Sequence, residues 1–198
     1  MKNLKTTTRT VAFATMMGMS AFAVVSCNSN KPEDPKDVAE EQNDERFDER
    51  KSEKDAQFLV EAATINMEEI KLGELAQQKG TMADTKDLGK MMVTEHKKAL
   101  ADLTKLAESK SIVLPAALPE EAQDAYDKLN EKTGVDFDKE YADKMVKGHK
   151  DAIDKFEKAS SDAEDADIRN WASSMLPSLR THLEHSEMCQ EKAKAMKK

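Results

Sequence analysis

The chain has 198 residues, of which 38% are hydrophobic, 35% charged and 5% aromatic, so it can form one ordinary domain with appendages but not two domains with separate cores. It carries 31 Lys and Arg against 39 Asp and Glu, and the first 26 residues hold three basic residues and no acid, which leaves 28 − 39 = −11 for the rest. That charge disfavours nucleic acids and anionic lipid headgroups as partners, and two cysteines cannot make a disulfide scaffold or a zinc finger.

The N-terminus has the pattern of a bacterial export signal. Residues 1–10 are polar and basic, and residues 11–25 are almost uniformly apolar or small. Because this run is too short for a membrane-spanning helix of about 20 residues, we predict a signal peptide over residues 1–26. Residues 24–27, Val-Val-Ser-Cys, resemble the lipobox of bacterial lipoproteins, which implies cleavage before Cys27 and lipid attachment to it. The alternative is ordinary signal cleavage with Cys27 as a bystander.

The segment after Cys27 is expected to be a tether. Lipoproteins that are retained at the inner membrane have Asp directly after the lipidated cysteine. This chain has Asn28 at that position, so the resemblance implies the outer membrane. Residues 28–51 contain two prolines, dense charge and three residues suited to burial, too few to offset the entropy of ordering the chain. We therefore predict a lipidated Cys27 and a charged, extended tether over residues 27–51, with a helical part near 37–51 as an option, and a bundle domain over 52–198.

Beyond residue 52 the apolar residues recur at steps of three and four, which predicts an all-α domain. Long helices are expected at 53–79, 85–110, 137–160 and from Asp165 or Asp167 to about 195, with a short helix at 120–132. Expected capping groups are Ser52 with Asp55, Asp84, Asp136, and Asp165 or Asp167. Pro177 should bend the last helix, because proline lacks the N–H that the helix needs.

The connection between the second and third long helices is the informative loop. It has roughly 25 residues, enough to cross the full length of a bundle, so these two helices should run parallel. An internal repeat supports this arrangement: residues 92–100 and 145–153 both read Met-Val-x-x-His-Lys-x-Ala-aliphatic. Two helical hairpins related by a pseudo-twofold axis would place the two repeats equivalently.

Each long helix carries one titratable residue near the middle of its apolar stripe: Glu69, His96, His149 and His182. A buried carboxylate needs a positive or hydrogen-bonding partner, and three imidazoles at the same level would supply it. This set suits one transition metal such as zinc, iron, copper or nickel. A metal-free buried hydrogen-bond network, or a surface position for these residues, is the alternative.

Other residues that could take part in metal binding also have ordinary structural interpretations. Met92 and Met145, each four residues before a histidine, fit core packing better than soft-metal ligation. Cys189 fits a buried spare thiol, and Trp171 fits packing. His185, three residues after His182, should meet solvent.

Several segments together resemble the ferritin-like domain of unknown function numbered 4142, common in exported bacterial proteins labelled as outer membrane proteins. They are residues 66–80, the two repeats, Phe-Asp-Lys-Glu-Tyr at 137–141 and Leu-Pro-Ser-Leu-x-x-His-Leu at 176–183. The resemblance covers about 52–195 and implies an up-down-down-up four-helix bundle, with Glu69 and the three histidines at the recurring polar positions. It implies little about activity.

The chain departs from true di-iron carboxylate bundles, which use Glu-x-x-His on two helices. Val93, Val146 and Leu179 stand three residues before the histidines, so a dinuclear carboxylate site is disfavoured. No nucleophile triad, nucleotide fingerprint or other catalytic residue is predicted, and an enzymatic role is disfavoured. The expected function is an envelope lipoprotein, bound to the membrane by its lipid, whose bundle binds zinc, iron or copper. The alternative is a metal-free structural or interaction module with an envelope protein as partner.

Overall fold

A computed structural model describes residues 32–47 and 50–196 of the chain, and this part is helical without a β-strand. The all-α prediction is therefore confirmed. The helices are α1 (Pro35–Asp44), α2 (Arg50–Lys79), α3 (Ala83–Ser109), α4 (Glu120–Asn130), α5 (Gly134–Asp162) and α6 (Ala166–Ala195). No helix in the described residues is both long and apolar enough to cross a membrane. The predicted signal peptide, Cys27 and Asn28 lie outside the described residues.

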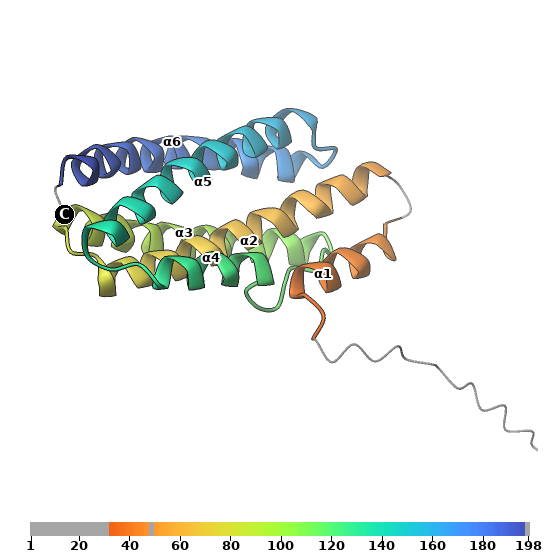
Figure 1. Ribbon diagram of the computed structural model, residues 1–198. Helices are drawn as coiled ribbons and strands as arrows, with labels where there is room; N and C mark the ends of the chain where they lie inside the picture. The colour runs from red at the N-terminus through yellow and green to blue at the C-terminus, as the bar shows by residue number, and fades with distance from the viewer. Residues whose placement is uncertain (1–31, 48–49, 197–198) are drawn as a thin grey trace, which may run out of the picture. The chain divides into compact units, whose positions relative to one another are not determined.

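The four long helices form two hairpins. Helix α2 packs along α3, and α5 packs along α6, whereas contacts between the two pairs are sparser (Figure 1). The short α4 lies in the connection between α3 and α5 and packs against α2 and α5. All four predicted long helices and the short helix are present within a few residues of their expected bounds. Helix α6 continues through Pro177.

Glycines set the closest approach of α2 and α3. A Cβ added to Gly73 would lie 2.7 Å from the carbonyl oxygen of Gly89, and one added to Gly89 would lie 2.8 Å from the carbonyl oxygen of Gly73. Neither backbone can yield without moving its helix, so only glycine fits at this crossing.

We expect Gly89→Ala to lower the free energy of unfolding by about 1–3 kcal/mol, because the added methyl group forces the helices apart. Gly148→Ala is the matched control, since its added Cβ would meet only the end of the Glu69 side chain, at 3.2 Å. Thermal unfolding followed by circular dichroism measures both. Equal melting temperatures for the two variants would contradict the close-packing argument.

The helix caps differ from the predicted ones at three of four places. Asp165 caps α6, as one of the two predicted alternatives, by accepting from the backbone N–H groups of Asp167 at 2.8 Å and Ile168 at 3.2 Å. The predictions of Ser52 with Asp55, Asp84 and Asp136 as N-caps are wrong: α2 begins at Arg50, and the N-cap residues of α3 and α5 are Met82 and Thr133, whose side chains make no capping hydrogen bond.

Asp55 has a tertiary role in place of the predicted local one. Its carboxylate accepts hydrogen bonds from the backbone N–H groups of Glu164 at 3.1 Å and Asp165 at 2.8 Å. Through these hydrogen bonds Asp55 links the short connection between α5 and α6 to α2.

Part of the predicted tether is a helix that packs on the domain. Asp34 caps α1 by accepting from the N–H of Lys36 at 2.8 Å. The Asn43 amide makes two bonds with the backbone of Val113, donating to its carbonyl at 2.9 Å and accepting from its N–H at 2.8 Å. The compact unit accordingly begins at Glu33 and includes α1.

Two apolar clusters fill the bundle. The Phe156 cluster includes Leu59, Leu103, Phe156 and Leu176, and the Tyr141 cluster includes Leu72, Met92, Tyr141 and Cys189. Along α3, α5 and α6 a single buried histidine lies between the residues of one cluster and those of the other. The two clusters therefore enclose a polar level in the middle of the domain.

Candidate metal centre

Three histidines from three helices meet at this level, and we call them the histidine layer: His96 from α3, His149 from α5 and His182 from α6. All are buried, with 4%, 1% and 4% of their surfaces exposed. Their ring centroids are 5.7 Å apart for His96 and His149 and 5.3 Å apart for the two other pairs. One ring nitrogen from each lies within 4.8 Å of those of the other two. This near-equilateral arrangement can place three nitrogens around one ion.

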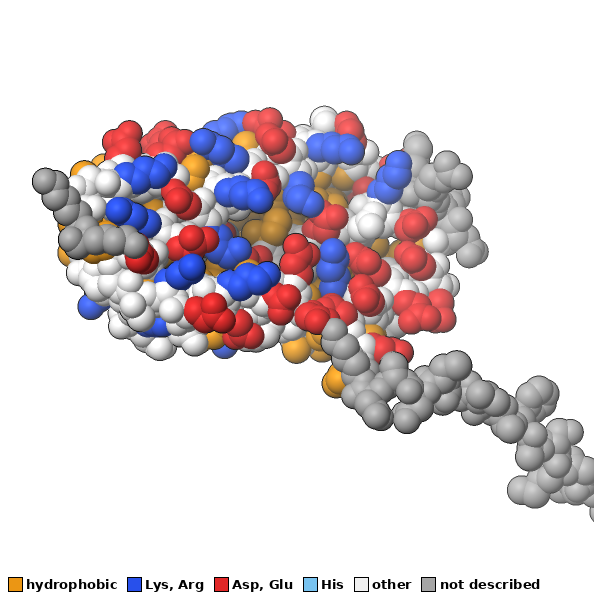
Figure 2. Space-filling model, in the orientation of Figure 1, with side chains coloured by type: hydrophobic (Ala, Val, Ile, Leu, Met, Phe, Trp, Pro, Cys, Tyr) orange, Lys and Arg blue, Asp and Glu red, His pale blue; other side chains and the backbone are white. Residues whose placement is uncertain are grey.

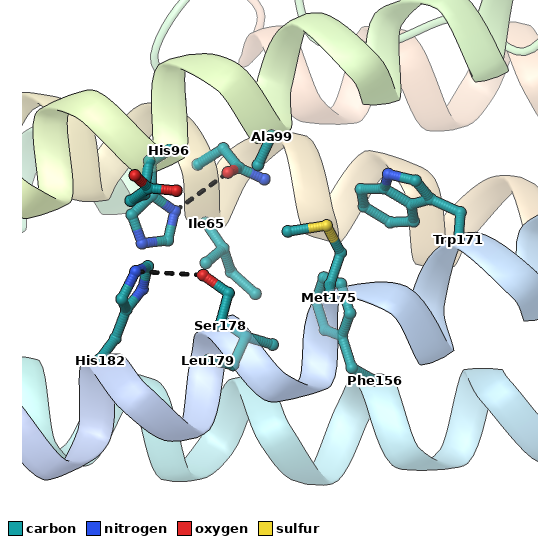
Figure 3. Close-up of a pocket in the computed structure, with 11 residues that line it drawn as sticks. Ile65, His96, Ala99, Phe156, Trp171, Met175, Ser178, Leu179 and His182 are labelled. Carbon is teal, nitrogen blue, oxygen red and sulfur yellow. Dashed lines mark hydrogen bonds between the residues drawn. The ribbon is translucent and has the colours of Figure 1, made fainter.

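One nitrogen of each ring is held by a hydrogen bond. His96 Nδ1 lies 3.0 Å from Asn66 Oδ1, and His182 Nε2 lies 3.3 Å from the Ser178 hydroxyl (Figure 3). His149 Nδ1 lies 2.8 Å from the carbonyl oxygen of Met145. Such contacts fix the ring orientation of metal-binding histidines and leave the opposite nitrogen as the ligand.

The partners also fix which nitrogen carries the proton. A backbone carbonyl only accepts, so His149 Nδ1 must donate to it. The Asn66 amide nitrogen donates to the Ala62 carbonyl at 2.7 Å, which leaves Oδ1 to accept from His96 Nδ1. The lone pairs of His96 and His149 therefore lie on their Nε2 atoms.

The remaining ring nitrogens have no hydrogen-bond partner among the described residues. They are His96 Nε2, His149 Nε2 and His182 Nδ1. Each buried polar atom left unsatisfied costs about 1–3 kcal/mol. Among the described residues no hydrogen bond joins one ring of the histidine layer to another, so the metal-free network that was the alternative is not closed by these side chains alone. A cation bound by one nitrogen of each ring would satisfy the unpartnered nitrogens that coordinate it.

Burial keeps the imidazoles uncharged. It lowers the pKa of His182 to about 4, with His149 and His185 adding to the effect. Burial, followed by the neighbouring His149 and His182, holds the pKa of His96 well below its ordinary value, and burial also lowers the pKa of His149. Neutral imidazole is the form that binds metals, so the histidine layer is ready to coordinate at neutral pH.

Glu69 lies beside the histidine layer but outside the set of three. Its Oε1 is 3.9 Å from His149 Nδ1, the nitrogen opposite the free one, and its Oε2 has no partner among the described residues. Burial, and after it the neighbouring Glu68, raise the pKa of Glu69 to about 8 against the lowering effect of Lys144. The structure thus brings three of the four predicted residues together and places the fourth behind His149.

The predicted softer ligands belong to the apolar packing of the bundle. Met92 and Met145 are fully buried in the Tyr141 cluster, and the Cys189 thiol lies 3.8 Å from the Thr85 hydroxyl. His185 is exposed, as predicted. The two side chains that hold the rings, Asn66 and Ser178, were not predicted from the sequence. Their signal was spacing, because Ser178 precedes His182 by one helical turn and Asn66 precedes Glu69 by three residues.

Comparison with known families decides the relationship of the chain. The family described as Domain of unknown function (DUF4142) matches residues 40–189, about three quarters of the sequence. The chain belongs to the DUF4142 family. The match includes every residue of the histidine layer and confirms the resemblance found in the sequence. Comparison of this DUF4142 protein with curated proteins and with solved structures gives no match.

Proposed function

We propose that this DUF4142 protein is a lipoprotein of the bacterial envelope whose ferritin-like, up-down-down-up bundle binds one transition metal ion through His96, His149 and His182. The single observation that carries the metal proposal is the convergence of three buried, neutral imidazoles, each with one nitrogen held and one left without a partner. Nitrogen ligands of this kind suit zinc, copper and iron.

Glu69 is proposed as the carboxylate that supports His149. Its Oε1 lies 3.9 Å from His149 Nδ1, and that nitrogen already donates to the Met145 carbonyl. The carboxyl is protonated at neutral pH in the metal-free protein, and we propose that it ionises when the cation binds and then stabilises the ligating ring as a neighbouring carboxylate. The sequence prediction that Glu69 is itself a ligand requires its side chain to reach past the ring. Direct ligation stays a prediction.

The anchor is proposed from the sequence. An apolar run ending in Val-Val-Ser-Cys supports lipid attachment at Cys27, and the charged segment that follows supports exposure to water.

On the face drawn in Figure 2, acidic and basic side chains are interspersed without a basic patch, which agrees with a protein that does not bind nucleic acid.

Metal analysis tests the central proposal. The protein purified without chelator should carry close to one equivalent of zinc, iron or copper by elemental analysis. The double variant His96→Ala, His149→Ala should carry less than a tenth of that. His185→Ala is the matched control and should keep the wild-type content, because His185 is exposed. Absence of metal in the wild-type protein, even after incubation with each ion, would leave the interaction module as the better explanation.

A further inference from the structure

The connection between α3 and α4 contains an apolar segment that the domain covers only in part. Residues 112–119 read Ile-Val-Leu-Pro-Ala-Ala-Leu-Pro and hold no polar or charged side chain, in a sequence of which 35% is charged. Ala116 and Ala117 are exposed, and the leucines on either side of them, Leu114 and Leu118, are half-buried. We call residues 112–119 the apolar segment.

An open groove extends the apolar surface beside this segment. Met67 of α2, Leu100 and Ala107 of α3, and Leu114 and Pro115 of the connection line it. Hydrophobic side chains reach the surface at the lower edge of the molecule in Figure 2, where Figure 1 places α1 and this connection. A continuous apolar surface on a single domain marks a contact with a protein or with a membrane.

Helix α1 runs along the apolar segment and fixes where the N-terminal chain enters the domain. Arg46, just after α1, donates to the carbonyl oxygen of Ser111 at 2.9 Å. The Asp34 carboxylate, at the start of α1, accepts from the backbone N–H of Glu120 at 2.6 Å. The compact unit begins at Glu33, so the chain enters it beside the C-terminal end of the apolar segment.

The length of the preceding chain decides which partner can meet this surface. Cys27 stands six residues before Glu33, and six residues span at most about 20 Å when fully extended. A lipid on Cys27 therefore holds the start of α1, and the apolar segment beside it, close to the bilayer. Helix α6 belongs to the other hairpin and packs on α3 and α5.

We propose that the apolar segment lies against the lipid bilayer and that it orients the domain on the membrane together with the short chain after Cys27. This inference rests on the proposed lipid anchor. The acyl chains supply the affinity, and membrane attachment by lipid is strengthened by a second contact. Because the chain between the two contacts is short, the second contact forms at a high effective concentration and can be weak by itself.

The charges around the apolar segment select the kind of lipid. Exposed acidic residues flank it at Glu33, Asp37, Glu120 and Glu121. Anionic headgroups attract basic segments and repel acidic ones, so this surface suits a bilayer of zwitterionic lipids.

The experiment uses the full-length lipidated protein in phosphatidylcholine vesicles whose acyl chains carry a spin label. One cysteine is introduced and labelled with the fluorophore NBD, either by Ala117→Cys in the apolar segment or by Ser173→Cys on α6 as the matched control. Both side chains are small and exposed, so neither change disturbs the core. Cys189 is buried, and the wild-type protein treated in the same way gives its background labelling.

We expect vesicles to move the emission of NBD at position 117 to shorter wavelength, and the spin label to quench it at least two-fold. The emission at position 173 should stay that of a label in water. Ala116→Cys repeats the measurement at the neighbouring exposed position if Ala117→Cys fails to fold. Equal quenching at the segment and at position 173, or quenching at neither, would overturn the inference.

Mass spectrometry of the same preparation separates this failure from failure of the anchor. Absence of quenching in a protein whose Cys27 carries lipid would overturn this inference alone. A Cys27 without lipid would overturn the proposed anchor and this inference with it. A shift of the emission at position 117 that appears without vesicles and grows with protein concentration would assign the surface to a second copy of the chain and overturn the membrane contact.

Discussion

Zinc added to the chelator-treated protein should raise its melting temperature by about 10 °C. An ion that binds only the folded state at a thousand times its dissociation constant contributes about 4 kcal/mol, and each kcal/mol shifts the melting temperature of a domain of this size by about 2–4 °C. The gain also relieves the unsatisfied nitrogens of His96, His149 and His182. Differential scanning calorimetry with and without metal measures it.

The control separates site binding from general metal effects. His96→Ala should reduce the metal-induced shift to a degree or two, because two imidazoles hold the ion far more weakly than three. His185→Ala should keep the full shift, since its ring is outside the histidine layer. If His96→Ala and wild type shifted equally with zinc, the ion would be bound elsewhere.

The helices could be predicted because their signal is local and repeated. Apolar residues at steps of three and four mark α2, α3, α5 and α6 over seven or more turns each. The capping residues of the helices could not be predicted, because tertiary contacts determine the hydrogen-bond partner of each acidic side chain. Asp55 bonds to the backbone before α6, and Asp84 pairs with Lys192 on α6, although both stand where a local cap is plausible.

Helix α1 is a whole element that the composition of its sequence did not predict. Its sequence has dense charge and few apolar residues, the composition of a solvated segment. Tertiary contacts order it, among them the burial of Ala39 and the pair of hydrogen bonds between Asn43 and Val113, seventy residues apart in the chain. The hydrophobic pattern of a segment does not contain such a contact, which depends on where the connection after α3 passes.

The histidine layer was predictable from helix phase, but its chemistry was not. Phase alone places His96, His149 and His182 on inward faces, and the structure brings them within ligand distance. Whether Glu69 joins them depends on side-chain direction and on which nitrogen of His149 faces the centre. That choice follows from the Met145 carbonyl one turn earlier on α5, a backbone atom with no sequence signature.

Glu69→Gln should remove the loss of stability of the metal-free protein as the pH rises from about 5 to 8. The pKa of Glu69 is about 8 in the folded state against an ordinary value of 4.5. Between these values the folded protein holds a proton that the unfolded chain has released. Stability therefore falls with rising pH, at most by about 1.4 kcal/mol per pH unit. Glutamine is neutral and of similar shape, so this dependence disappears and the variant is the more stable protein at pH 8.

The histidines give the opposite slope and serve as an internal reference. Their pKa values are lowered in the folded state, that of His182 to about 4, so the unfolded chain binds protons first and stability falls as the pH drops below about 6.5. Melting temperatures in chelator from pH 4.5 to 9 should pass through a maximum in the wild type. In Glu69→Gln only the acidic decline should remain. Parallel curves of melting temperature against pH for the two proteins between pH 6.5 and 8 would mean that Glu69 is already ionised in the folded protein. Direct ligation of the metal by this carboxylate would then be the better explanation of its role.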